Sequence, residues 1–313
     1  MIAALGLLLA LLAAATLWRV STRRNAALAA HPPAGAFVTV AGHRVHYLQR
    51  GSGPDLILIH GASGNTTDMD LAIAPELSKR YRVTLFDRPG LGHSPALAAR
   101  GVTLADQADL LSAAARALGL QPAVIAGQSL GGAVVMTWAL RHPEDVVALV
   151  SIAGATHPWP GELSRLHLNL ARPILGPVLA HLIAAWVPTT YLRAQVDAVF
   201  TPQPAPPGYA DQIGTGLVAR PESLIANAQQ RSDLRAELQG QAPEYARLLL
   251  PIEIVHGSAD DIVSLDIHAK VLASQAPNAH LAVLPGIGHM PHHVATPEVI
   301  AAIDRAAARA GLH

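Results

Sequence analysis

The sequence predicts an α/β fold, a doubly wound and mostly parallel sheet of eight strands with a helical cap inserted into it. Short, continuously apolar runs alternate with longer segments of helical periodicity, which is the pattern of parallel strands covered by helices on both faces. The run Leu56–Ile59 is typical, because a strand buried on both faces has no polar side. The alternation stops between residues 155 and 250, where every signal is helical.

The first two strands are predicted to form a hairpin. Residues 37–40 and 44–48 alternate in polarity around Ala41-Gly42, as two paired strands joined by a tight turn do. The other six strands are the apolar runs 56–59, 83–86, 123–126, 147–152, 252–255 and 281–284. Helical patterns lie at residues 68–80, 103–118, 130–141, 265–276 and 297–310.

The helical stretch from residue 155 to residue 250 is too long for a loop and predicts an inserted subdomain. Its residues 173–187 are strongly apolar. They indicate either a helix buried within the subdomain or a lid wall that faces a lipophilic substrate. The predicted domains are an anchor or signal-like segment at 1–20, a linker at 21–36, a core at 37–154 and 251–313, and the cap at 155–250.

The N-terminal segment predicts a membrane anchor. Met1–Trp18 carries no charge and spans ~27 Å as a helix, close to the thickness of a bilayer core. Arg19, Arg23 and Arg24 follow it, and the positive-inside rule then favours an uncleaved anchor with the rest of the chain in the cytoplasm. The alternative is a cleaved signal peptide and an exported protein, although a signal peptide has its positive charges first.

Composition excludes several classes of function. The formal net charge is +0 and no long basic run is present, so nucleic-acid binding through phosphate contacts is not expected. Cysteine is absent, which excludes disulfides, thiolate metal sites and a cysteine nucleophile. Apolar residues make up 51% of the chain, enough to fill a large core.

Residues 127–132, with the sequence GQSLGG, have the pattern of a nucleophile elbow. They lie between an apolar run and a helical pattern, with glycine two residues to either side of Ser129. Glycine is needed there because the turn leaves no room for side chains and strains the serine backbone. The serine hydroxyl would then stand near the free N–H groups of a helix start, which can stabilise an oxyanion.

A serine nucleophile needs a histidine base that an acid orients. Candidates should lie at the carboxyl ends of strands, where open α/β sheets bind ligands. His289 follows the last strand, and Asp260 follows the strand 252–255. Asp261 adjoins Asp260 and is a second candidate on the residues alone. The chain order of Ser129, Asp260 and His289 is the order associated with the nucleophile elbow.

Over residues 37–310 the chain resembles the α/β-hydrolase fold superfamily, in its cap-bearing serine hydrolase and esterase branch. The family's spacing favours Asp260 over Asp261 as the acid. The motifs that carry the resemblance are His60-Gly61, the segment Asp87–Ser94, the elbow, the turn Gly257–Asp260, and Gly288-His289.

The resemblance implies a role for each matching residue. Ser129 is expected to be the nucleophile, His289 the general base, and Asp260 the residue that orients the imidazole. The backbone N–H groups of Ala62 and Leu130 are expected to form the oxyanion hole.

Four other residues of these motifs are expected to support the site without reacting. His60 is expected to hold the oxyanion loop by hydrogen bonding, without transferring protons. Asp87, Arg88 and His93 are expected to form a network that sets the loop beneath the elbow.

No metal or cofactor is predicted. His289, His292 and His293 have a spacing that could hold a metal on one helical face, but the sequence shows no acidic or cysteine ligand beside them. The segment Gly90–Gly92 lacks the third glycine of a dinucleotide loop, which argues against a nicotinamide or flavin.

These observations predict a serine hydrolase that cleaves a carboxylic ester through an acyl-enzyme on Ser129. The expected partner is a small ester, either lipophilic or small and uncharged, and a membrane contact through the N-terminal segment is expected. Serine at this position argues against haloalkane dehalogenases and epoxide hydrolases, which resemble the chain but use aspartate. The alternatives are a perhydrolase or haloperoxidase, a carbon–carbon bond hydrolase, a thioesterase, an amidase, an acyltransferase, or a non-catalytic binding protein.

Overall fold

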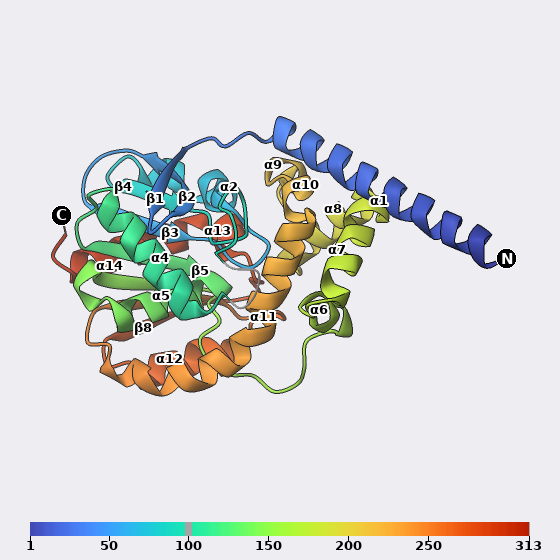
Figure 1. Ribbon diagram of the computed structural model, residues 1–313. Coiled ribbons are helices and arrows are strands. Elements are labelled where there is room, and N and C mark those ends of the chain that lie inside the picture. The colour runs from blue at the N-terminus through green and yellow to red at the C-terminus, as the bar shows by residue number, and fades with distance from the viewer. Residues whose placement is uncertain (98–101, 313) are drawn as a thin grey trace.

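The predicted eight-stranded sheet is confirmed in the computed structural model, which describes residues 1–97 and 102–312 (Figure 1). The strand order is β1-β2-β4-β3-β5-β6-β7-β8. β2 runs antiparallel to β1 and β4, and all other neighbours are parallel. The strands are β1 (Ala36–Val40), β2 (His43–Arg50), β3 (Asp55–Ile59), β4 (Arg82–Phe86), β5 (Ala123–Gln128), β6 (Val146–Ile152), β7 (Ile252–Gly257) and β8 (Ala279–Leu284).

Burial along the strands follows their place in the sheet. Every residue of the central strands β3 and β5 is buried, whereas the edge strands β1 and β8 are largely half-exposed or exposed. The continuous apolar runs in the sequence are therefore the strands that helices cover on both faces.

Helices pack on both faces of the sheet. α4, α5 and α12 share one hydrophobic core with the sheet, and α2, α3 and α14 share the other. The single helix expected over residues 68–80 is two helices, because Pro75 has no N–H to continue the first. The bounds are α2 (Thr66–Ala72), α3 (Ala74–Leu77), α4 (Leu104–Ala117), α5 (Leu130–Arg141), α12 (Lys270–Gln275) and α14 (Thr296–Arg309).

The chain between β6 and β7 contains helices and no strand, and we call it the helical insertion. Its longest helix, α11, lies between the sheet domain and the helices α6 to α8 (Figure 1). The helices of the insertion are α6 (Arg165–Leu170), α7 (Leu175–Trp186), α8 (Thr189–Asp197), α9 (Tyr209–Gln212), α10 (Thr215–Val218) and α11 (Pro221–Gln241).

The N-terminal helix α1 (Ile2–Ala30) is longer than the sequence predicts. Residues 21–30, expected to belong to a linker, are its last ten residues, and this end of α1 packs against the helical insertion (Figure 1). Arg19 and Arg23 explain the docking, because their guanidinium groups donate hydrogen bonds to the carbonyl oxygens that end α7. Helix C-termini leave such carbonyls free and favour cations. The arginines expected only to follow a membrane segment also join α1 to the insertion.

Truncating a buried strand residue should destabilise the fold strongly. Leu58 of β3 is 1% exposed, and Leu58→Ala should lower the free energy of unfolding by about 2–5 kcal/mol through lost burial and a cavity. Leu249→Ala is the control, because Leu249 is 70% exposed and should change stability by less than ~0.5 kcal/mol. Urea denaturation of both full-length variants checks this, and equal midpoints would contradict the packing described.

Candidate active site

Ser129 occupies the turn from β5 into α5 with a strained backbone, φ +52° and ψ −120°. Two glycines permit the turn. A Cβ on Gly127 would lie 2.3 Å from the carbonyl oxygen of Gly131, and a Cβ on Gly131 would lie 2.4 Å from that of Ile59. Only glycine allows the strand and the helix to approach this closely, so the sequence dictates the local geometry that presents Ser129.

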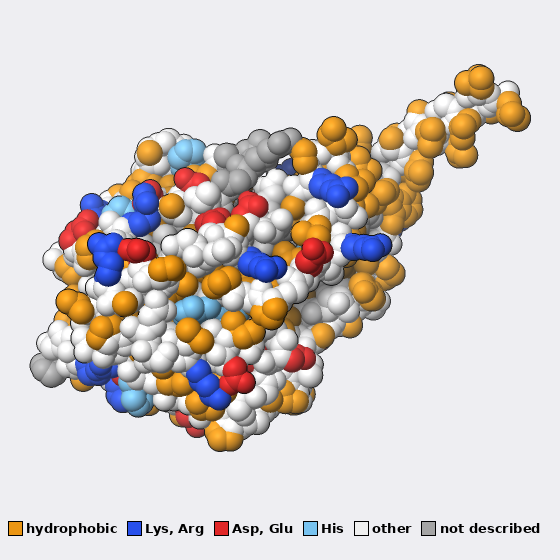
Figure 2. All heavy atoms as spheres, turned by 90° about the horizontal axis from the view of Figure 1, so that it is seen from below, with side chains coloured by type: hydrophobic (Ala, Val, Ile, Leu, Met, Phe, Trp, Pro, Cys, Tyr) orange, Lys and Arg blue, Asp and Glu red, His pale blue; other side chains and the backbone are white. Residues whose placement is uncertain are grey.

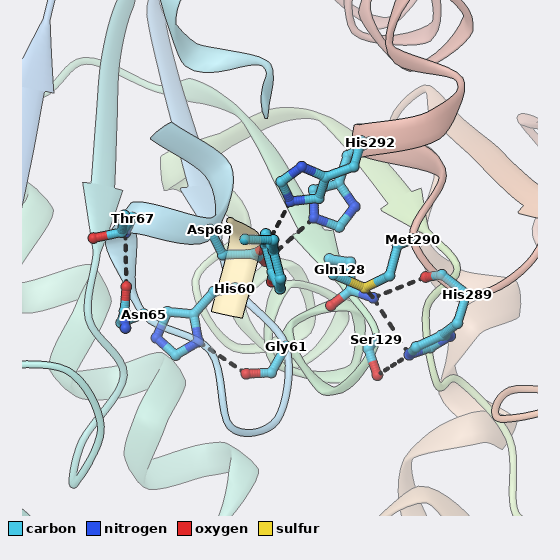
Figure 3. A network of polar contacts seen from close by, with 12 residues as sticks. His60, Gly61, Asn65, Thr67, Asp68, Gln128, Ser129, His289, Met290 and His292 are labelled. Carbon is cyan, nitrogen blue, oxygen red and sulfur yellow. Dashed lines mark hydrogen bonds and ion pairs between the residues drawn. The ribbon is translucent and has the colours of Figure 1, made fainter. Parts of the chain in front are cut away.

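The structure brings Ser129, His289 and Asp260 together in one chain of hydrogen bonds. The Ser129 hydroxyl lies 3.0 Å from Nε2 of His289, and Figure 3 shows the two side chains facing each other. Nδ1 of His289 donates to Oδ2 of Asp260 at 2.8 Å. Because a carboxylate only accepts, the proton on His289 is held at Nδ1, and Nε2 is left free to accept from the serine.

Asp260, not Asp261, has the geometry of the acid. Its second oxygen accepts hydrogen bonds from the N–H groups of Ile262 and Val263, both at 2.9 Å, whereas Asp261 is exposed. Burial alone would raise the pKa of Asp260. Hydrogen bonds from His256 and His289 outweigh it and hold that pKa well below its usual range. Asp260 is therefore a carboxylate that stays ionised beside the imidazole.

His256, at the end of β7, supports Asp260 and was not found in the sequence analysis. Its Nε2–H donates to the carbonyl oxygen of Val263 at 2.7 Å and lies 3.3 Å from Oδ2 of Asp260. The side chain is fully buried. In the sequence it directly follows the apolar run 252–255, and only its position four residues before Asp260 hints at a contact.

Gln128, directly before Ser129, is the second residue that the sequence analysis missed. Its side-chain amide donates to the carbonyl oxygen of His289 at 3.1 Å, and the same nitrogen lies 3.3 Å from the imidazole Nε2 (Figure 3). Gln128 therefore holds the loop that carries His289 against the elbow. The nucleophile-elbow pattern allows any residue at the position before the serine, so no motif identifies Gln128.

Ala62 and Leu130 line the cavity beside Ser129. Leu130 is the first residue of α5, and the N–H groups of a first helical turn have no acceptor within the helix. Ala62 follows β3, in the loop that lies against the elbow. Both residues therefore stand where the oxyanion hole was expected.

Two buried side chains fix the loop that carries Ala62. Arg88 donates to the carbonyl oxygens of His60 and Gly61 at 3.0 Å and 2.8 Å, and also to the side chain of Gln230 on α11. His60 donates from Nδ1 to Gly61 at 2.8 Å and accepts at Nε2 from the Arg88 N–H. Burial and the charge of Arg88 lower the pKa of His60 to about 4, so its ring is neutral at neutral pH. His60 has the supporting contacts expected of it.

Asp87 forms the expected network beneath the elbow. It accepts hydrogen bonds from Nδ1 of His46 at 2.7 Å, the N–H of Thr66 at 2.6 Å and the N–H of His93 at 2.7 Å. These donors come from β2, from the start of α2 and from the loop after β4. One buried carboxylate thus joins three segments that converge behind the oxyanion loop.

A cluster around Asp68 corrects one statement of the sequence analysis. An acidic residue does accompany His292 and His293, because the fold brings Asp68 of α2 to them from 224 positions earlier in the chain (Figure 3). Asp68 accepts from Nε2 of His292 at 3.2 Å, Nε2 of His293 at 2.8 Å and the Tyr209 hydroxyl at 2.8 Å.

Two histidines and a carboxylate are ligands that divalent metals use, and these ligand atoms lie within 4.8 Å of one another. Here Asp68 already accepts hydrogen bonds from Nε2 of both imidazoles. Burial would raise the pKa of Asp68, but His292 and His293 hold it well below the usual range. We interpret the cluster as a clamp that joins α2, the insertion helix α9, and α13 (Pro291–Val294), which starts two residues after His289.

A cavity of about 530 Å³ lies over Ser129 and His289. Most of its far wall comes from the helical insertion and is apolar. Polar side chains on the wall include Asp68, Tyr209 and Arg231. The apolar lining includes Trp159, Leu163, Leu192, Val196, Ile213 and Leu234.

Known proteins share this fold. A family model described as the alpha/beta hydrolase fold matches residues 54–173. The structure is similar to that of an alpha/beta hydrolase fold protein from Burkholderia ambifaria, with a TM-score of 0.69, 21% identity, and coverage of 87% of this chain and 97% of that chain. The chain therefore has the α/β-hydrolase fold.

Two other proteins to which this chain is similar carry names that describe an activity. The pimeloyl-[acyl-carrier protein] methyl ester esterase of Nitrosomonas europaea is 29% identical over 269 residues, which is 79% of this chain and 93% of that protein. A bacterial membrane phospholipase A of known structure is 24% identical with a TM-score of 0.66, over 97% of this chain and 98% of that chain. Because α1 takes up 29 of the 313 residues, the second match includes part of that helix.

The Asp68 clamp should contribute strongly to stability. Asp68→Ala leaves two imidazoles and a phenol without their shared acceptor, and should lower the free energy of unfolding by about 3–5 kcal/mol. Asp70→Ala on the same helix is the matched control, because its ion pair with Arg50 is partly exposed and should contribute about 0–1 kcal/mol. Urea unfolding of both variants measures the difference, and similar losses would exclude a clamp at Asp68.

Proposed function

We propose that this chain is a serine ester hydrolase that works through an acyl-enzyme on Ser129. The observation that carries the proposal is the hydrogen-bonded chain from Ser129 to His289 at 3.0 Å and from His289 to Asp260 at 2.8 Å, at the wall of an apolar cavity. The relatives named as esterases support the same chemistry.

In the first half of the reaction, the Ser129 oxygen attacks the ester carbonyl while its proton moves to Nε2 of His289. Asp260 keeps Nδ1 protonated and stabilises the imidazolium that forms. The carbonyl oxygen becomes an oxyanion, which the N–H groups of Ala62 and Leu130 stabilise. One such donor typically contributes ~3 kcal/mol to the transition state.

The tetrahedral intermediate then collapses by breaking its bond to the alcohol oxygen. That oxygen takes the proton from Nε2 of His289 and leaves as the free alcohol, with the acyl group bound to Ser129. In the second half, a water molecule gives a proton to His289 and attacks the acyl carbonyl. Return of this proton to the Ser129 oxygen releases the carboxylic acid and restores the enzyme.

The cavity indicates the kind of ester. The wall that the helical insertion contributes consists mainly of Trp159, Leu163, Leu192 and neighbouring apolar side chains. The part of the substrate that lies against this wall should therefore be apolar. We therefore propose carboxylic esters with a lipophilic acyl or alcohol part as substrates.

Removing the nucleophile should abolish turnover without unfolding the protein. Ser129→Ala should lower kcat for 4-nitrophenyl butyrate by roughly 10⁴–10⁶, because the remaining residues cannot replace the nucleophile. The control is Ser274→Ala, whose hydroxyl bonds to Val271 on α12, and which should keep wild-type kcat. A fluorophosphonate probe should label wild type but not Ser129→Ala. Failure of wild type to cleave the ester, or equal labelling of both proteins, would refute the proposal.

We also propose that α1 holds the enzyme on a membrane, with the folded domain on the cytoplasmic side. Within the described residues, α1 is the only unbroken helix that is long and apolar enough to cross a bilayer. Its residues 2–14 are all exposed and project from the body as an apolar rod (Figure 2). The basic residues Arg19, Arg23 and Arg24 follow the apolar part, as the positive-inside rule requires.

The apolar surface of α1 continues onto α7, and we propose that α7 also contacts lipid. Arg19 stacks on the ring of Trp186 with 4.6 Å to its centroid, and the Trp186 indole donates to Thr16. α7 has 12 residues, or ~18 Å, and the chain bends by 106° between α7 and α8. α7 is therefore too short to cross the ~30 Å hydrocarbon core and is suited to lie in the membrane–water interface. Exposed apolar residues form a stripe with a four-residue repeat, from Ile174 just before α7 (83%) through Val178 (54%) and Leu182 (39%) to Trp186 (42%), and Leu175 beside them is also exposed.

A fluorophore on α7 tests this contact. The chain has no cysteine, so Val178→Cys can be labelled specifically with an environment-sensitive NBD dye. On phosphatidylcholine–phosphatidylglycerol vesicles, the dye should shift to the blue and be quenched by nitroxide-labelled lipid. Leu8→Cys on α1 is the positive control, and Ala308→Cys on α14, exposed on the sheet domain, is the negative control. A water-like signal at 178, or a blue shift that lipid nitroxides do not quench, would exclude the α7 contact.

A further inference from the structure

Arg231 of α11 is a largely buried cation on the wall of the active-site cavity. Its guanidinium donates to Nε2 of His167 at 2.7 Å. Burial lowers its pKa, and within residues 1–97 and 102–312 no carboxylate lies close enough to pair with it. A buried charge without a counter-ion costs free energy. Because this part of the chain supplies no counter-ion, a bound ligand is expected to supply it.

His167 does not supply the missing negative charge. Because its Nε2 accepts from Arg231, its proton lies on Nδ1, which faces the Ser164 hydroxyl at 2.7 Å. Burial and the charge of Arg231 lower the pKa of His167 to about 4. The ring is therefore neutral at neutral pH, and the pair keeps the full positive charge of the guanidinium.

Arg88, the other buried arginine near the site, shows how a structural arginine is satisfied in this protein. Its Nε, Nη1 and Nη2 each donate to oxygen atoms, from the carbonyls of His60 and Gly61 and from two glutamine side chains. Arg231 has one such contact, to a nitrogen, and lines the cavity. Its remaining donors are therefore available to a molecule in the cavity, in the forked arrangement that matches carboxylate or phosphate oxygens.

α11 also places Arg231 near the reacting centre. Asn227, four residues earlier, accepts at Oδ1 from the Ser63 N–H at 2.8 Å, next to Ala62. Residues four apart lie on the same face of a helix with Cβ atoms ~6 Å apart. Arg231 therefore stands one helical turn beyond the contact that holds the oxyanion loop.

We propose that Arg231 binds an anionic oxygen group that the ester substrate itself carries, a carboxylate or a phosphate diester. The proposal rests on the proposed function and narrows it. The apolar wall would hold the hydrocarbon part of the substrate and Arg231 its one negative charge. The substrate class is then an amphiphilic ester with a negative charge, whereas the sequence predicts an ester that is either lipophilic or small and uncharged.

Matched pairs of charged and neutral esters test this proposal. The first pair is the monomethyl and dimethyl ester of the same dicarboxylic acid, which tests a carboxylate. The second pair is lysophosphatidylglycerol and monoacylglycerol with the same acyl chain, which tests a phosphate diester. We expect full-length wild type to prefer the charged member of one pair in kcat/KM by about tenfold or more. Arg231→Gln should remove that preference, and Arg231→Lys should keep part of it.

The neutral esters and a neighbouring arginine serve as controls. Arg231→Gln should lose at least tenfold more kcat/KM on the charged ester than on 4-nitrophenyl butyrate, because the neutral ester has no group that pairs with the guanidinium. Arg235→Gln changes an exposed arginine of the same helix, bonded to the Gly161 carbonyl, and should keep the preference. Equal use of charged and neutral esters by wild type would overturn the proposal, as would an equal loss on both kinds in Arg231→Gln. Neither result affects the Ser129→Ala test of ester hydrolysis.

Discussion

The close approach of β5 and α5 at Ser129 is the constraint on which the site depends. Gly127 and Gly131 leave space for backbone alone, so α5 starts directly against β3. Neighbouring strands then lock the turn, because the Ser129 N–H donates to the carbonyl of Ile152 at 3.0 Å. A strained residue persists only where its surroundings over-determine it, and here three strands of the sheet contribute. The position of the hydroxyl is therefore a property of the whole sheet.

The other segments of the site are each held in place relative to Ser129 by a buried polar group. Arg88 holds the oxyanion loop, Asp260 with His256 holds the imidazole, and Asp68 joins the segment after His289 to α2 and the insertion. Hydrogen bonds and ion pairs between such groups are strong, because the protein interior has a low dielectric constant. Precise placement of the candidate triad thus depends on contacts that take no part in the chemistry.

The sheet and the meeting of Ser129 and His289 at its edge could be predicted because both follow from local pattern, and the family resemblance added the choice of Asp260 over Asp261. Apolar runs mark buried strands, and reactive residues at strand ends meet at one edge. The Asp68 cluster could not be predicted, since it joins residues 224 positions apart with no periodic signal. The length of α1 was also missed, because tertiary bonds from Arg19 and Arg23 to the end of α7 stabilise its second half. Arg231 shows the same limit, since a charge on a helix does not reveal what it faces.

The cavity contains two buried charges that the protein treats differently. Asp68 receives three hydrogen bonds, so its negative charge is compensated within the fold. Within residues 1–97 and 102–312, no carboxylate pairs with Arg231, and its contact is to the neutral imidazole of His167. A negatively charged ester in the cavity could pair with Arg231. Asp68 would repel it only weakly, because three hydrogen-bond donors already compensate the charge of Asp68. Electrostatics would then orient an amphiphilic ester within an apolar cavity, because apolar walls alone discriminate poorly between the two ends of a chain.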